Sequence, residues 1–108
     1  MTQFEALILT LASEVPVMLL LVRRLPVLRV LPVAVTASLI THPIAWHMAS
    51  ILSPAEYHAG MAWIEGGVVL IEAIWYRIWL SRIFLQALAW SLAANAFSFM
   101  VGWLVFAL

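Results

Sequence analysis

Four long apolar stretches, separated by short connectors, make up most of the chain and limit what it can fold into. They cover about residues 4–22, 30–52, 60–80 and 83–108. An α-helix needs about 20 mostly apolar residues to cross the hydrocarbon core of a bilayer. Charged residues make up only 9 % of the chain, and hydrophobic residues 67 %. The sequence therefore predicts an all-α, polytopic membrane protein, with residues 1–108 forming a single compact bundle of four transmembrane helices.

The arginines predict the orientation of this bundle. The middle connector, with Glu56 and His58, contains no arginine. All five arginines lie in or beside the first and third connectors: Arg23, Arg24, Arg29, Arg77 and Arg82. Because arginine-bearing connectors stay on the cytoplasmic side of a membrane, both termini are expected outside, an N-out/C-out topology. The expected location is the bacterial cytoplasmic (inner) membrane, which the chain would cross as a multi-pass protein.

Composition and motifs exclude several classes of function. The net charge is zero, and the basic stripe that nucleic acid would require is missing. The sequence contains no Gly-rich phosphate loop, no His-Glu-x-x-His and no Gly-x-Ser-x-Gly, so nothing identifies an enzymatic reaction. The expected partners are the lipid bilayer and either further copies of this chain, as a homo-oligomer, or subunits of a larger membrane complex.

Each apolar stretch carries one or two polar residues near its middle. In chain order they are Glu14, His42, Glu65 with Glu72, and Asn95. An ionisable side chain at membrane depth costs about 2.5–3.5 kcal/mol on insertion scales. A chain that accepts such a group in every span is expected to gather them into one interior site.

Counting from the nearest arginine predicts the depth of each group. At 1.5 Å per residue, His42, Glu65 and Asn95 fall in one layer, about 18–20 Å from the arginines. Glu14 lies about 13 Å from the arginines, and Glu72 lies closer to them. The sequence therefore predicts a ladder of polar groups across much of the bilayer.

Helical spacing places several of these groups on common faces. Glu65 and Glu72 are seven residues apart and share a face with Tyr76. Ser91, Asn95 and Ser98 form one stripe along the fourth stretch, as in membrane helices that pack closely and hydrogen-bond to one another. We therefore expect supporting contacts from Thr41, Tyr76, Ser91 and Ser98.

The preferred hypothesis is a proton or cation site used for transport. Two carboxyl groups close together in a low-dielectric interior cannot both be ionised unless they meet a cation. We expect the site to consist of Glu14, His42, Glu65, Glu72 and Asn95. The cofactor is unknown; a metal ion is one candidate, and its ligands would be His42, Glu65 and Glu72.

Two alternatives come from different classes of protein. In one, the polar groups only fix helix packing in a structural or accessory subunit of a larger complex. In the other, His42 ligates a tetrapyrrole and Trp46, four residues later, stacks on the flat cofactor.

The four short-looped spans and Glu14 also resemble the small multidrug resistance transporters. Ser13-Glu14-Val15 is similar to an Ala-Glu-Val/Ile element of that family, and Trp63 with Gly67-Val-Val-Leu-Ile71 is similar to its third span. The resemblance implies a proton-coupled exporter of cationic compounds. That family has no equivalent of Glu65, Glu72 or Thr41-His42-Pro43.

Overall fold

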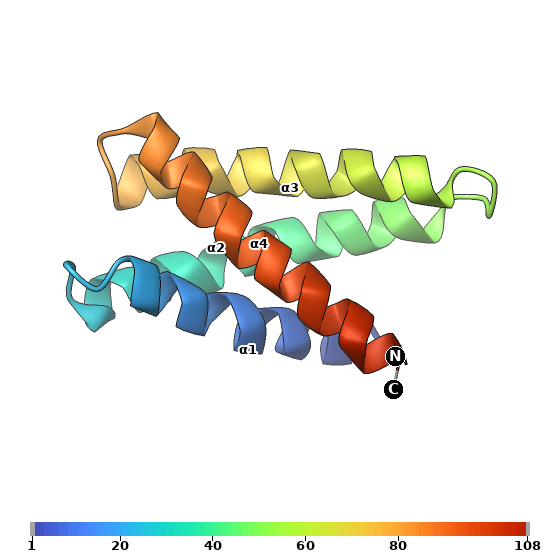
Figure 1. The fold of residues 1–108 in the computed structure, drawn as a ribbon, viewed down its shortest axis with the longest axis horizontal. Helices are drawn as coiled ribbons and strands as arrows, with labels where there is room; N and C mark the ends of the chain where they lie inside the picture. The colour runs from blue at the N-terminus through green and yellow to red at the C-terminus, as the bar shows by residue number, and fades with distance from the viewer. Residues whose placement is uncertain (1, 108) are drawn as a thin grey trace.

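The computed structural model describes residues 2–107, which form four α-helices and no strand (Figure 1). The all-helical prediction is therefore confirmed. Each helix is long and apolar enough to cross a membrane. Their bounds are α1 Gln3–Leu21, α2 Val27–Ser50, α3 Tyr57–Trp79 and α4 Phe84–Ala107.

The helix bounds differ from the predicted spans by a few residues. The second begins at Val27, directly after Pro26, because proline fits the start of a helix and has no amide proton to leave unpaired. The third begins at Tyr57, three residues before the predicted boundary at Gly60. At the other end of the chain, the Thr2 hydroxyl accepts a hydrogen bond from the Glu5 amide and caps α1.

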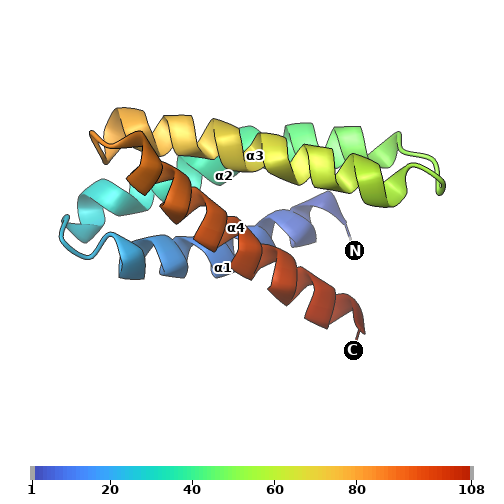
Figure 2. The same cartoon turned by 45° about the horizontal axis from the view of Figure 1, so that its top comes forward.

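The helices run alternately up and down, and each packs on two neighbours in the closed order α1–α2–α3–α4–α1. The pairs α1/α3 and α2/α4 therefore lie diagonally opposite each other. The long axis of the bundle measures 42 Å, which matches a bilayer with its headgroup regions. Both termini lie at one end, and α4 crosses the bundle obliquely, from beside the end of α3 to beside the start of α1 (Figures 1 and 2).

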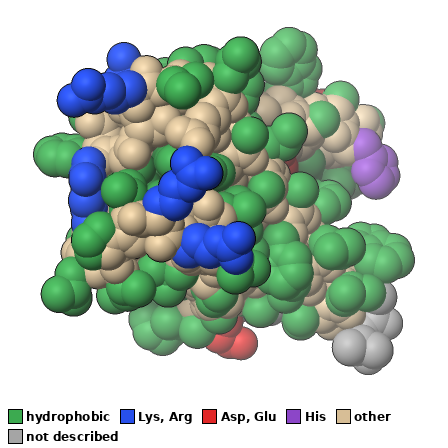
Figure 3. Space-filling view, turned by 60° about the vertical axis from the view of Figure 1, so that its left-hand side comes forward, with side chains coloured by type: hydrophobic (Ala, Val, Ile, Leu, Met, Phe, Trp, Pro, Cys, Tyr) green, Lys and Arg blue, Asp and Glu red, His purple; other side chains and the backbone are tan. Residues whose placement is uncertain are grey.

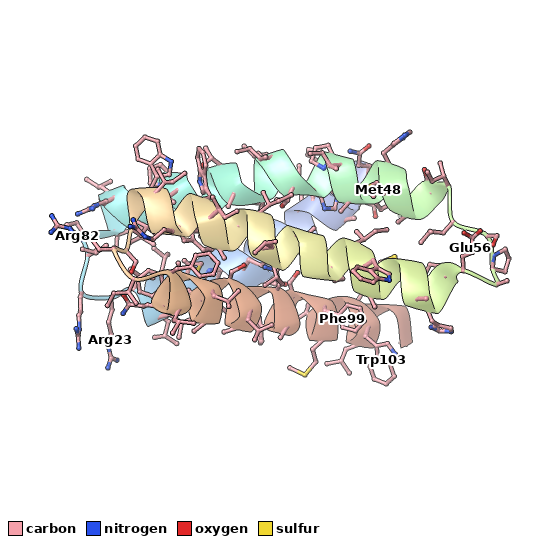
Figure 4. All side chains as sticks on the ribbon, turned by 90° about the horizontal axis from the view of Figure 1, so that it is seen from above. Arg23, Met48, Glu56, Arg82, Phe99 and Trp103 are labelled. Carbon is pink, nitrogen blue, oxygen red and sulfur yellow. The ribbon has the colours of Figure 1, made fainter. Side chains whose placement is uncertain are left out.

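The arginine-bearing connectors lie at the other end. Arg23 and Arg82 mark this end in Figure 4, whereas Glu56 lies at the opposite one. Blue arginine side chains are spread over this end of the surface among hydrophobic ones (Figure 3). The Arg29 guanidinium also donates to the carbonyl of Trp79, 3.3 Å away, which ties the start of α2 to the end of α3.

Candidate functional site

Glu72 is the centre of a polar cluster inside the bundle. Its side chain is 1 % exposed, and both carboxyl oxygens accept hydrogen bonds from neighbouring helices. The Thr41 hydroxyl of α2 donates to Oε2 at 2.7 Å, and the Asn95 amide of α4 donates to Oε1 at 2.7 Å. One acid on α3 is thereby joined to both helices that flank it.

Asn95 and Ser91 extend this cluster along α4. The second Asn95 amide hydrogen is directed at the Ser91 carbonyl, 2.8 Å away. The Ser91 hydroxyl donates to the Val69 carbonyl of α3 at 2.7 Å. The stripe predicted on the fourth span therefore faces α3, where it supplies hydrogen bonds between the two helices.

Thr41 is placed to interact with Glu72 in either protonation state. Its hydroxyl lies within hydrogen-bonding distance of two acceptors, Glu72 Oε2 and the Ala37 carbonyl at 3.0 Å. A hydroxyl has one proton and donates to one acceptor at a time. With a proton on Oε2, Glu72 would donate to Thr41 and Thr41 to Ala37, so that each polar group would have a partner.

Glu14 faces Glu72 from the diagonally opposite helix. It is 3 % exposed, and its carboxyl group lies against both Glu72 and Ser98 of α4. Its Oε1 atom is buried and has no hydrogen-bond partner. All four helices thus contribute to the cluster, through Glu14, Thr41, Glu72 and Asn95.

Two further hydroxyl groups are fully buried in the bundle. Tyr76 is 0 % exposed, and its hydroxyl has no partner although it lies near Glu14 and Glu72. Ser38, on α2, is also 0 % exposed and unpartnered. Sequence reasoning missed Ser38 as a member of the site; its spacing of three residues from Thr41, on the same side of the helix, is the signal that would have found it.

Glu65 and His42 lie at the edge of this cluster. Both are only half-buried, and among residues 2–107 neither side chain forms a hydrogen bond to the clustered groups. Glu65 is still close enough to interact electrostatically with Glu14 and Glu72. His42 lies against the backbone of Gln3, and its ring centroid is 6.0 Å from that of Trp46.

The predicted layering is therefore wrong in one respect: Glu72, and not Glu65, lies level with Asn95. Counting from the arginines failed because the two reference residues do not mark the same height in the bundle. Arg77 lies within α3, whereas Arg82 precedes the first residue of α4. The oblique path of α4 also shortens its rise along the bundle axis (Figure 1).

The metal prediction receives no support from this geometry. Within the described part of the chain, no three His, Cys, Asp or Glu side chains converge in a way that could hold a metal ion. The proposed ligands His42, Glu65 and Glu72 belong to two different environments, the half-buried edge and the buried cluster.

Comparisons with protein-family models, with curated proteins and with solved structures found no match for the chain. The resemblance to the small multidrug resistance transporters therefore rests on the quoted residues alone.

Proposed function

We propose that the protein is a small integral membrane protein that carries protons through the paired carboxyl groups of Glu14 and Glu72. The observation that carries this proposal is the burial of both groups, face to face, at the centre of the bundle. Two buried carboxylates side by side repel each other strongly, so such a pair holds a proton between them. A pair that binds and releases one proton is a carrier.

The fixed geometry of the cluster supports this role. Glu72 is held by Thr41 and Asn95, whereas Glu14 keeps one oxygen unpartnered. The hydrogen bonds to Glu72 stabilise its ionised form, and the Thr41–Ala37 arrangement accommodates its protonated form. Glu72 therefore exchanges a proton without a rearrangement of its neighbours, while Glu14 serves as the partner that takes or returns it.

We extend the proposal to orientation and assembly. The arginine-bearing end faces the cytoplasm and both termini face outside, because arginines remain on the cytoplasmic side. The membrane is a bacterial cytoplasmic one. The chain acts as a homo-oligomer, because the exposed Gly66 of α3 has open space beside it that a second chain can occupy.

Proton flux into liposomes tests the function. Purified protein is reconstituted with a pH-sensitive dye inside, and flux is driven by a potassium diffusion potential. We expect flux in the native protein and its loss in Glu72→Gln, which can keep both interhelical hydrogen bonds by accepting from Asn95 and donating to Thr41. Glu56→Gln, in the exposed connector between α2 and α3, is the matched control and keeps the native flux.

One observation favours a second candidate, a structural or accessory subunit. Both oxygens of Glu72 are already satisfied by α2 and α4, as in a clamp that fixes helix packing. In that case the native protein shows no more flux than protein-free liposomes, or Glu72→Gln retains it. Either result would overturn the proton-carrier proposal.

A further inference from the structure

Buried side chains are concentrated in one half of the bundle. Among the described side chains, every buried residue except Ile64 lies within residues 13–41 and 72–95. These segments form the half that carries the arginine connectors. The carboxyl pair lies at the inner boundary of this packed half.

Between the carboxyl pair and the arginine-bearing end lies an apolar barrier. It consists of Met18, Val22, Val30 and Leu80, with exposures of 0 %, 3 %, 1 % and 8 %. Met18 and Val22 lie at the end of α1, Val30 lies near the start of α2, and Leu80 directly follows α3. All four belong to one hydrophobic cluster. These side chains are closed off from solvent, and protein interiors leave few voids as large as a water molecule, so no water-filled route is expected between them.

The other half of the bundle is loosely packed around α4, although Gly60, at the start of α3, lies close to the Leu52 side chain. There α4 diverges from the first half of α3 (Figures 1 and 2). A Cβ atom added at Gly102 would meet nothing within 4 Å. This half also contains Glu65 and His42, the two half-buried ionisable groups next to the cluster, and Glu65 interacts electrostatically with both acids.

We propose that the carboxyl pair exchanges protons with water only through the half of the bundle that carries the termini. Glu65 is the relay residue at the inner end of this route, and Met18, Val22, Val30 and Leu80 are the barrier that closes the arginine side. The physiological use of the route rests on the proposed proton carriage, but its access to water is measurable without any transport.

Thiol accessibility tests the route directly, because the chain has no cysteine of its own. Single cysteines are introduced into the full chain in lipid nanodiscs and treated with a small cationic methanethiosulfonate reagent. The route reporters are Glu65→Cys and Val101→Cys, and the barrier reporters are Met18→Cys and Leu80→Cys. Ala55→Cys, in the exposed connector, sets the reference rate, and Leu92→Cys, on the outer face of α4, reports lipid.

We expect the route reporters to react within about tenfold of the reference, and the barrier reporters about a hundredfold more slowly, since a packed site reacts only by local opening. Leu92→Cys should be as slow as the barrier, because a charged reagent does not partition into lipid. Protection of both route reporters, or fast reaction of both barrier reporters, would overturn the proposal. Leu80→Cys stands in where Met18→Cys fails to fold.

The two proposals fail separately. The expected thiol pattern without proton flux would support the proposed route and contradict the proposed carrier function. Proton flux with protected route reporters would support the proposed carrier function and contradict the proposed route. Glu65→Gln adds a third test, since the relay role predicts slower flux with an unchanged thiol pattern at Val101→Cys.

Discussion

The two halves of this bundle differ in how their side chains are packed. In the arginine-bearing half, small side chains line the contacts between helices, and Ala34, Ala73, Ala87 and Ala94 are at most 1 % exposed. In the half with the termini, large side chains such as Trp63 and Trp103 point outward, with exposures of 84 % and 64 %. Small residues let membrane helices approach closely. The half with the termini also contains small residues, but a Cβ atom added at Gly66 or Gly102 would meet nothing within 4 Å, so no neighbouring helix packs against them.

This difference explains where the polar cluster lies. Glu72, Thr41 and Asn95 hydrogen-bond only because the helices beside them are close enough for short side chains to meet. Glu65, seven residues or about two turns earlier on α3, is in the loosely packed half and makes no such contact within the described residues. Packing, and not polarity alone, separates the two acids of α3.

The largest expected effect comes from overfilling the packed half. Ala94→Leu places three extra carbon atoms where the native side chain is 0 % exposed, so it should lower the free energy of unfolding by about 3 kcal/mol. Gly102→Leu, eight residues later on the same helix, has open space and should not lower it, because leucine favours a helix more than glycine does. Unfolding in mixed detergent micelles with rising SDS measures both. Equal losses would mean that the two halves are packed alike.

Removing the central acid should have the next largest effect. Glu72→Ala leaves the donors of Thr41 and Asn95 without their shared acceptor and should cost about 2 kcal/mol, since interhelical hydrogen bonds in membranes average about 0.6 kcal/mol and reach about 1.7. Glu72→Gln should cost less than about 0.5 kcal/mol, because it can keep both hydrogen bonds. A Gln variant as unstable as the Ala variant would show that the negative charge, not the hydrogen bonding, holds the cluster.

Substitution of two tryptophans of α3, one in each half, should have smaller effects on stability. The Trp75 indole donates to the Val33 carbonyl and to the Thr36 hydroxyl of α2, at 3.1 and 3.2 Å. Trp75→Phe removes these contacts and should cost about 1 kcal/mol. Trp63→Phe, in the loosely packed half, should leave stability unchanged in the same SDS titration, and a loss as large as that of Trp75→Phe would reveal contacts on this face.

The smallest effect is expected at Gly66. A Cβ atom there would meet nothing within 4 Å, so Gly66→Ala should change stability by no more than about 0.5 kcal/mol. Chemical cross-linking of this variant in liposomes also tests whether the chain forms an oligomer through this face. Loss of a cross-linked dimer in Gly66→Ala, with monomer stability intact, would place a second chain against this face of α3.

The number and order of the helices follow from the sequence because length and hydrophobicity decide membrane insertion. Four apolar stretches with short connectors leave an alternating bundle as the simple solution. The pairing of Glu72 with Asn95 was not predictable by counting, because the tilt of α4 and the place of Arg77 inside α3 shift the register between helices. Such shifts depend on side-chain packing across the whole bundle.

The composition of the cluster was predicted better than its geometry. Glu14, Glu72 and Asn95, with the supporting Thr41, Tyr76, Ser91 and Ser98, lie together or against one another. Periodicity identified them because a polar face on an apolar helix points inward. Glu65 and His42 obey the same periodicity, but α4 diverges from α3 in the half that carries the termini (Figures 1 and 2), and no sequence pattern reports that divergence.

The central claim is that Glu14 and Glu72 hold a proton between them, and infrared spectroscopy of the purified protein tests it most directly. A protonated carboxyl group in an apolar interior gives a carbonyl stretching band that an ionised one lacks. We predict this band at neutral pH in the native protein, a shift of its frequency in Glu14→Gln and in Glu72→Gln, and its loss from the pair in the double variant. A native spectrum without the band, or a double variant with an unchanged band, would contradict the account.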